Sequence, residues 1–359
     1  MARARNPYSG LPPPRFWRKA IAEQLPHAVD PVVAPRFTLR PTDRIATAGS
    51  CFAQHISRAL QARDFAFFVS EPAPPDLSPS EAKARNFGVF TARFGNLYTT
   101  RQLLQLFQRA FGTFSPGEDV WALPDGRLVD PFRPAIEPGG FATEELLRAD
   151  REAHLAAVRR MFLELDVFVF TLGLTEAWRS RVDGAVYPVA PGVSGGEYDP
   201  ARHEFVNFEV EEVVGDFAAL VTGLRAINPG CRILLTVSPV PLVATYEDRH
   251  VLVSTTYSKS VLRVAADKLC RAFEGIDYFA SYELITGHFN GGRYFEPDLR
   301  SVNELGVDHA MRLFLAHYAA VPLHGGGLSP GALQVRRAEA EQAAAVICDE
   351  EAIAKVSGG

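Results

Sequence analysis

A glycine, a serine and a cysteine follow one another at the end of an apolar run in the stretch IATAGSCFAQHISRAL. The run up to Gly49 is typical of a buried strand, and the residues after Cys51 have the spacing of an amphipathic helix. Side chains at a helix N-terminus lie beside unpaired backbone N–H groups, which lower a thiol pKa and stabilise an oxyanion. Ser50 or Cys51 is therefore a candidate nucleophile; alternatively, Ser50 caps the helix and Cys51 packs in the core.

Composition limits the classes of function. The chain has 359 residues, of which 47% are hydrophobic, enough for one large domain with insertions or two smaller ones. The net charge of −5 gives no electrostatic reason to expect nucleic acid or an anionic membrane as a partner. No apolar run has the roughly 18 residues of a membrane span, and prolines interrupt the N-terminus where a signal peptide would need an apolar core. We therefore predict a cytoplasmic protein.

Known metal and nucleotide motifs are missing from the sequence. The four cysteines are widely spaced and form no CxxC pair, which indicates neither a disulfide framework nor a zinc site. No Walker loop, GxGxxG turn, HExxH motif or EF-hand loop is present. We predict no cofactor and no metal.

Five apolar runs alternate with helical segments, at residues 44–49, 65–69, 166–173, 231–237 and 276–283. Because parallel neighbours need crossover connections, this order predicts a three-layer α/β fold with a parallel five-stranded sheet. We expect an extended arm at 1–43, the main domain at 44–322 and a linker with a helical tail at 323–359. The helical block at 86–165 is expected to cover the mouth of a pocket as a cap. Ligands bind at the carboxyl ends of such strands, after Ala48, Leu172, Val237 and Glu283.

The segment AGSCFAQHI resembles the signature of the GSCFA family, within the wider SGNH (GDSL-type) hydrolase group. Further segments resemble that family in the same order and extend the resemblance over about residues 6–320: NPYSGLPPPRFW, ARFGNLYTTRQLLQLF, VFVFTLGLTEAW, LLTVSPVPLVAT, YSKSVLR and SYELIT. The resemblance implies a flavodoxin-like fold. It also implies that Cys51 occupies the position of the nucleophilic serine, which would suit acyl transfer through a thioester, with Ser50 as the substitute if the turn is shifted by one residue.

The same resemblance implies where an oxyanion is held. Gly95 and Asn96 in FGNLYT would supply donors, and Thr175 stands in GLTE where an Asn is expected, followed by Glu176. As alternatives, Asn96 is a turn residue and Glu176 a charge in the first turn of a helix.

The family's usual base is missing. The stretch DLRSVNELG fits the last motif of the hydrolase group at Asp298 and Gly306, but Ser301 stands at the histidine position. A serine cannot act as a general base near pH 7, which puts ordinary serine-esterase activity in doubt. His203 and His250 are the candidate replacements, since both follow carboxyl ends of predicted strands and correspond to family histidines. His55, His288 and His309 are weaker candidates.

Three further side chains are candidates for substrate binding. Arg93 and Lys259 could hold a carboxylate or phosphate, with surface ion pairs as the alternative. Trp178 could stack on a sugar face or fill the core. We predict an acyl-ester hydrolase or acyltransferase, and the resemblance suggests an acylated carbohydrate or polysaccharide precursor as substrate. The alternative is a binding protein on a hydrolase scaffold that has lost catalysis. The acyl donor, the acceptor and the oligomeric state remain open.

Overall fold

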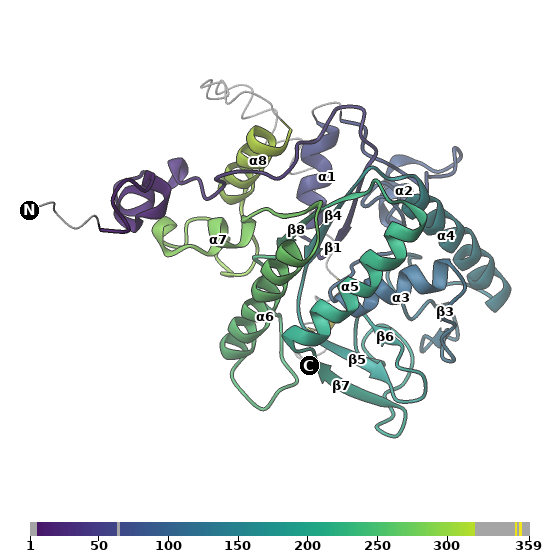
Figure 1. The fold of residues 1–359 in the computed structure, drawn as a ribbon. Helices are drawn as coiled ribbons and strands as arrows, with labels where there is room; N and C mark the ends of the chain where they lie inside the picture. The colour runs from purple at the N-terminus through teal and green to yellow at the C-terminus, as the bar shows by residue number, and fades with distance from the viewer. Residues whose placement is uncertain (1–5, 63–64, 320–348, 350–351, 354–359) are drawn as a thin grey trace, which may run out of the picture.

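A parallel sheet of four strands forms the centre of the computed structural model, which describes residues 6–62, 65–319, 349, 352 and 353 (Figure 1). The strands lie in the order β1-β4-β8-β9. Their bounds are Ile45–Gly49 for β1, Val167–Leu172 for β4, Arg232–Val237 for β8 and Ile276–Tyr278 for β9. The α/β class and the parallel sheet are therefore confirmed, with four strands instead of five.

The predicted strand at 65–69 contributes one parallel bridge, between Phe67 and Ile45, on the outer side of β1. Ile45 donates its N–H to Ala66 at 3.1 Å and accepts from Phe68 at 2.9 Å. The ladder stops there because the Thr47 N–H, next along β1, donates to Thr91 Oγ1 at 2.9 Å, and the Ser70 N–H donates to the carbonyl of Thr91 at 2.8 Å. A second difference lies at 276–283, where β9 ends early because helix α7 begins at Ser281.

Helices cover both faces of the sheet. In β4, Phe168, Phe170 and Leu172 face a core shared with α3, α4, α5 and α6, whereas Val167 and Val169 face a core shared with α1, α7 and α8. All six residues of β4 are buried, as expected for a strand between two layers. The helices are α1 (Ala53–Gln61), α2 (Pro79–Ala84), α3 (Thr100–Ala110), α4 (Glu144–Glu164), α5 (Val210–Ile227), α6 (Val251–Ala272), α7 (Ser281–Thr286) and α8 (Glu304–Tyr318).

Two small antiparallel sheets lie outside the main sheet. One has the order β6-β5-β7, with β5 at Glu176–Ser180, β6 at Val186–Tyr187 and β7 at His203–Asn207. The other pairs β2 (Trp121–Ala122) with β3 (Leu128–Val129). Since β5 begins four residues after β4 ends, the first of these sheets continues directly from the carboxyl edge of the main sheet.

The 86–165 segment supplies α3 and α4, which pack on α5 over one face of the main sheet. Helix α3 starts with a capping box, in which Thr99 accepts from the Gln102 N–H and the Gln102 side chain accepts from the Thr99 N–H. The cap role expected for this segment stays a prediction.

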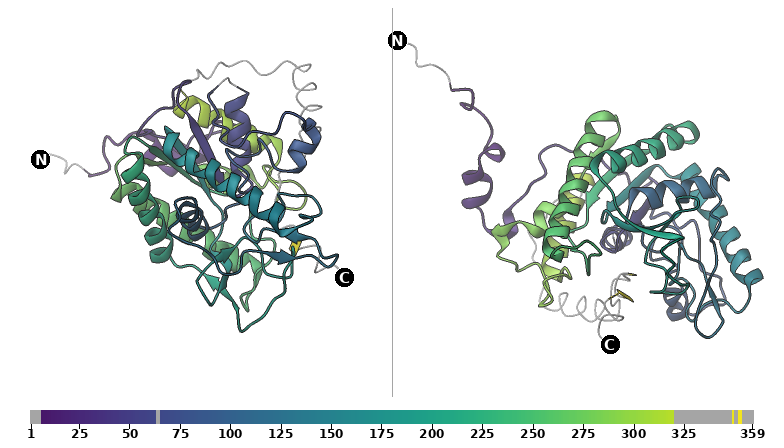
Figure 2. Two further views of the ribbon diagram at one scale, coloured as in Figure 1. Left: turned by 90° about the vertical axis from the view of Figure 1, so that its right-hand side faces the viewer. Right: turned by 90° about the horizontal axis from the view of Figure 1, so that it is seen from below.

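The N-terminal arm lies on the α7–α8 side of the molecule (Figure 2). It contains three short helical turns, at Pro13–Arg15, Arg18–Ala22 and Pro26–Ala28, and a fourth turn, His288–Asn290, follows α7. The Leu39 N–H donates to the carbonyl of Tyr318 at 2.6 Å, which ties the arm to the end of α8. The helical tail expected at 323–359 falls mostly outside the described residues. Within the described part of the chain, no helix has both the length and the apolar character of a membrane span.

Candidate functional site

Three chain segments meet where β1 and β4 end. The Leu97 N–H donates to the carbonyl of Gly49 at 2.9 Å, next to the Gly-Ser-Cys turn. One residue further on, the carbonyl of Tyr98 accepts hydrogen bonds from both Gly173 and Leu174, each at 3.1 Å. Residues 97–98 therefore link the turn after β1 to the turn after β4 through backbone hydrogen bonds alone.

Two glycines allow these turns to approach so closely. Gly49 has φ +128°, and a Cβ there would lie 2.3 Å from the carbonyl oxygen of Thr171. A Cβ on Gly173 would lie 3.1 Å from the Cβ of Ser50 and 3.0 Å from the carbonyl oxygen of Tyr98. The Ser50 side chain is thus packed directly against the start of the GLTE segment.

Ser50 and Cys51 both lie below the surface, 3% and 5% exposed. The Ser50 N–H donates to the carbonyl of Thr171 at 3.1 Å, but its hydroxyl has no hydrogen-bond partner among the described residues. Helix α1 starts two residues after Cys51, and its N-cap is Phe52, without a side-chain cap. The Ser50 hydroxyl therefore does not cap the helix, and a buried hydroxyl without a partner normally requires an explanation.

Thr175 lies at the same edge, fully buried. Its N–H donates to the Ser258 hydroxyl at 3.0 Å, and its own hydroxyl donates to Asn207 Oδ1 at 2.6 Å. Asn207 in turn donates through Nδ2 to Glu247, 2.9 Å away. The hydroxyl that replaces the family's expected Asn is therefore bonded to an amide from β7. The sequence carried no signal for Asn207, because its position opposite Glu176 depends on the β5–β7 register.

Lys259 and Glu176 adjoin the same turn. The Lys259 side chain is only 2% exposed, and its Nζ donates to the carbonyl of Gly173 at 2.6 Å. It is thus not an exposed surface lysine. Glu176 begins strand β5 instead of a helix and accepts a hydrogen bond from the Thr245 hydroxyl at 2.6 Å. Partial burial raises the pKa of Glu176, although the bonds from Thr245 and Tyr246 act in the opposite direction.

Asn96 faces a carboxylate from the far end of the chain. It is 1% exposed, and its Nδ2 and backbone N–H lie 3.0 and 3.4 Å from Asp349 Oδ2. Gly95, next to it, has φ +68°, and a Cβ there would lie 3.7 Å from the same oxygen. Burial raises the pKa of Asp349, and the hydrogen bonds from Asn96 only partly oppose this. Since Leu97 is bonded to Gly49, these donors lie one residue from the contact with the Gly-Ser-Cys turn.

Neither histidine proposed as the base is placed among these residues. His203 is fully buried on β7, where Nε2 lies 3.0 Å from Glu118 and Nδ1 accepts from the Asp199 N–H at 3.1 Å. It is four residues along the strand from Asn207, a span of roughly 13 Å. His250 is exposed, and its Nδ1 accepts from the Leu252 N–H at 3.1 Å as the N-cap of α6.

The Asp298 motif forms a short polar turn. The Ser301 hydroxyl donates to Asp298 Oδ2 at 2.6 Å, and both residues lie toward the surface. Arg300, between them, donates from Nε to the carbonyl of Pro241 at 3.2 Å. Because Pro241 follows β8, this turn belongs to the same edge of the sheet. Asp298 is thus hydrogen-bonded to a serine hydroxyl in this turn, at the position where the resemblance led us to expect a histidine.

Of the weaker histidine candidates, His55 packs beside Phe52, with ring centroids 5.4 Å apart. Burial and the nearby Arg58 lower its pKa to about 4. His309 lies 2.7 Å from the Tyr294 hydroxyl in the α8 layer, and His288 stacks on Trp17 in the N-terminal arm.

Arg93 is buried and lies in an internal ion-pair network. Its guanidinium donates to Asp150 at 2.7 Å and to the carbonyls of Arg85 and Ile136 at 2.8 and 3.0 Å, and it covers the ring of Phe87. Glu71 lies 3.6 Å from the same guanidinium, so its donors are engaged by protein groups.

Trp178, on β5, belongs to an aromatic group. The rings of Tyr198, Phe205 and Tyr246 lie 5.1, 6.0 and 4.8 Å from it, centroid to centroid. Tyr198 and Tyr246 are 45% and 63% exposed, which leaves an accessible aromatic surface. The Tyr246 N–H lies 3.3 Å from Glu176 Oε2, so this surface borders the turn after β4.

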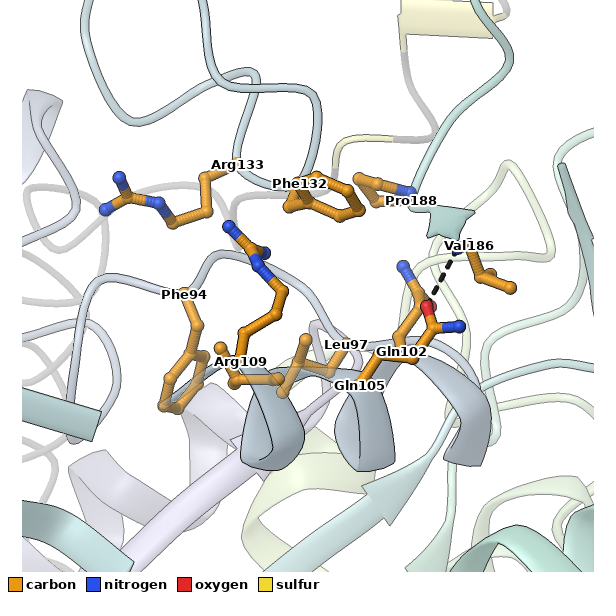
Figure 3. A pocket seen from close by; sticks show the side chains of 10 residues that line it. Phe94, Leu97, Gln102, Gln105, Arg109, Phe132, Arg133, Val186 and Pro188 are labelled. Carbon is orange, nitrogen blue, oxygen red and sulfur yellow. Dashed lines mark hydrogen bonds between the residues drawn. The ribbon is translucent and has the colours of Figure 1, made fainter. Parts of the chain in front are cut away.

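The sequence reasoning missed a buried charge cluster formed by side chains of α3, of α4 and of the loop between them. Asp130, 0% exposed, pairs with Arg133 and Arg151, each at 3.1 Å. Arg109 rises from α3 toward Phe132 beside a cavity of about 20 Å³ (Figure 3). These charges have the spacing of solvated helix faces and of a Pro/Gly-rich loop, so no pattern in the sequence indicated their burial. In the described residues, no three His, Cys, Asp or Glu side chains are grouped to hold a metal ion.

Comparison with known proteins places the chain in a family. The model of the GSCFA family matches residues 44–314. A solved structure, a carbohydrate esterase family 3 from Talaromyces cellulolyticus, matches with 10% identity over 76% of this chain and 94% of that chain, at a TM-score of 0.32. The comparison with curated proteins returned no match. The family match confirms the prediction made from the Gly-Ser-Cys turn and its companion segments, and the chain belongs to the GSCFA family.

Proposed function

We propose that this protein is an acyl-ester hydrolase or acyltransferase on a flavodoxin-like, SGNH hydrolase-like fold, with Cys51 as the nucleophile and Ser50 as its alternative. The observation that supports this most directly is the Gly-Ser-Cys turn itself. Its serine hydroxyl is buried and has no hydrogen-bond partner among the residues that the structure describes; its backbone is hydrogen-bonded to β4, and it is packed against the turn that carries Thr175.

The strand order supports the fold assignment. Phe67 pairs outside β1, and β4, β8 and β9 follow on the other side. If the bridge at Phe67 is counted as the position of a second strand, this arrangement matches the order 2-1-3-4-5 of flavodoxin-like sheets, whose ligands bind where the strand order reverses. In this chain that point lies between β1 and β4, where the Gly-Ser-Cys turn is located.

The chemistry follows from the groups at this edge. The Cys51 thiolate attacks the ester carbonyl carbon, and the carbonyl electron pair moves to oxygen. The N–H and Nδ2 of Asn96 are the donors that we assign to this oxyanion. The C–O bond then breaks, the alcohol leaves with a proton from water, and a thioester remains. Water or an acceptor hydroxyl attacks the thioester and regenerates the thiol.

No histidine is needed for the attack if Cys51 is already ionised. The positive end of α1 and the buried amine of Lys259 both favour negative charge at this edge. We accordingly assign the base role to neither His203, whose two ring nitrogens are both engaged elsewhere, nor His250, which is exposed and caps α6 through Nδ1.

A carbohydrate ester fits the surroundings of the turn. The exposed faces of Tyr198 and Tyr246 beside Trp178 offer an apolar surface for a sugar ring, adjacent to Glu176. The Glu176 carboxylate can accept hydrogen bonds from sugar hydroxyls.

Acylation by p-nitrophenyl acetate, followed by intact-protein and peptide mass spectrometry, tests the proposal. We expect an acetyl adduct on Cys51 that is absent in Cys51→Ala. An adduct that persists in Cys51→Ala and disappears in Ser50→Ala would transfer the nucleophile role to Ser50. Cys231→Ala is the matched control, because burial raises the pKa of its thiol to about 12 and it should not react. Undiminished turnover in the Ser50→Ala, Cys51→Ala double variant would refute the proposal.

The second candidate function is a binding protein that has lost catalysis. The pairing of Ser301 with Asp298 favours it, because a serine in that hydrogen bond cannot shuttle protons near neutral pH. Iodoacetamide distinguishes the two, since an activated Cys51 alkylates near neutral pH much faster than a thiol of ordinary pKa, about 8.5. Slow labelling together with ligand binding would favour the binding protein.

A further inference from the structure

Asp349 is a buried carboxylate without a cationic partner in the described chain. It is 9% exposed, and its Oδ2 accepts hydrogen bonds from Asn96 Nδ2 at 3.0 Å and from the Asn96 N–H at 3.4 Å. Among the described residues it forms no ion pair with Lys, Arg or His. A buried carboxylate is normally paired with a cation, because desolvation of an unpaired charge is costly.

Two amide donors converging on one oxygen are the arrangement that stabilises an oxyanion or a ligand carboxylate. The donors also have a suitable position. Asn96 is adjacent to Leu97, whose N–H donates to Gly49 at 2.9 Å, one residue before Ser50. Gly95 lies beside the same oxygen, since a Cβ there would be in ordinary van der Waals contact with Asp349 Oδ2, at 3.7 Å.

We propose that the two donors of Asn96 form a binding subsite for a negatively charged ligand oxygen, of a carboxylate or an oxyanion, and that Asp349 occupies this subsite when no ligand is bound. The chain thereby competes with its own ligand. An ester whose oxyanion uses these donors must first displace Asp349; this last step rests on the proposed function, whereas the subsite itself does not.

Two alkylating reagents that differ in charge test the subsite without ester chemistry. Iodoacetate carries a carboxylate and iodoacetamide does not, so the ratio of their rates at Cys51 cancels the intrinsic reactivity of the thiol. We expect Asp349→Ala to raise this ratio roughly tenfold, the scale of one hydrogen bond to a charged group. Asn96→Ala in the Asp349→Ala background should return the ratio to the wild-type value.

The controls separate this effect from a change in net charge or folding. Asp76→Asn removes an exposed carboxylate in a loop and should leave the ratio unchanged. Cys231 and Cys270 in the same samples report any general loosening of the structure. An Asp349→Ala ratio equal to that of Asp76→Asn would overturn the subsite.

Ester turnover by the same variants separates this inference from the proposed function. A higher kcat/KM for Asp349→Ala than for the wild type supports the competition. A raised labelling ratio without any ester turnover, in wild type or variant, would support the anion subsite and refute the proposed esterase function. A loss of turnover in both Asp349→Ala and Asp349→Asn, in folded protein, would make Asp349 a participant in the reaction and overturn its role as a competitor.

Discussion

Replacement of Gly173 by alanine tests the close packing of the two turns. The new Cβ would lie 3.0 Å from the carbonyl oxygen of Tyr98 and 3.1 Å from the Cβ of Ser50, so both must move by a few tenths of an ångström. Gly173 does not have a positive φ, so the effect comes from crowding and not from backbone strain. Overpacking costs about 1–3 kcal/mol, and the loss of unfolded-state entropy returns about 0.4–1 kcal/mol. We expect a net loss of about 1–2 kcal/mol in the free energy of unfolding.

The same displacement should affect the reaction more than the stability. A shift approaching 1 Å in a reacting group can lower a rate about 100-fold, and we expect kcat/KM for p-nitrophenyl acetate to fall roughly 10- to 100-fold. Urea denaturation and initial rates provide the two readouts. Gly215→Ala is the matched control: it lies on the exposed face of α5 with no atom near its Cβ position and should stabilise by about 0.5–1 kcal/mol. A Gly173→Ala variant with wild-type stability and rate would refute the packing described for Ser50.

Three further variants follow from the same contacts. Gly49→Ala should lower the free energy of unfolding by about 3–5 kcal/mol or prevent folding, since its Cβ would lie 2.3 Å from the Thr171 carbonyl oxygen; soluble yield and urea denaturation measure this, and a well-folded variant would contradict it. Asp130→Asn should cost about 3–5 kcal/mol in the same assay because it removes the fully buried carboxylate that pairs with both Arg133 and Arg151, and an unchanged midpoint would argue against the buried cluster. Burial lowers the pKa of His154 to about 4, below the 6.5 of the unfolded chain, so the unfolded state binds more protons and stability falls as pH drops from 6.5 toward 4. Between pH 7 and 5 the wild type should lose about 2 kcal/mol more than His154→Gln, measured by urea denaturation at both pH values, and equal losses would count against a neutral buried imidazole.

The sequence predicted those elements that can be recognised from their own residue types. Strands β1, β4 and β8 are nearly continuous apolar runs, and the structure places their ends within one residue of the predictions. Such runs are informative because both faces of a parallel strand must be buried, whatever its neighbours are. The family, too, could be identified from the Gly-Ser-Cys turn and the motifs that follow it.

The remaining features depended on partners that are distant in sequence. Strand β7 exists because β5 pairs with it, and this pairing brings Asn207 to the turn but carries His203 away from it. Lys259 lies in a polar stretch that is typical of a surface, yet it is buried because α6 packs over the turn after β4. A local pattern cannot reveal either placement, since burial here is decided by contacts between elements.

The backbone link at residues 97–98 has a consequence for engineering. The N–H groups of Leu97, Gly173 and Leu174 all donate to backbone carbonyls in the hydrogen bonds that join the two turns. Recognition of a new substrate would therefore have to be built from side chains around this scaffold. Substitutions in the aromatic group of Trp178 and Tyr246 would then change the surface beside the turns while the hydrogen-bonded turns keep their geometry.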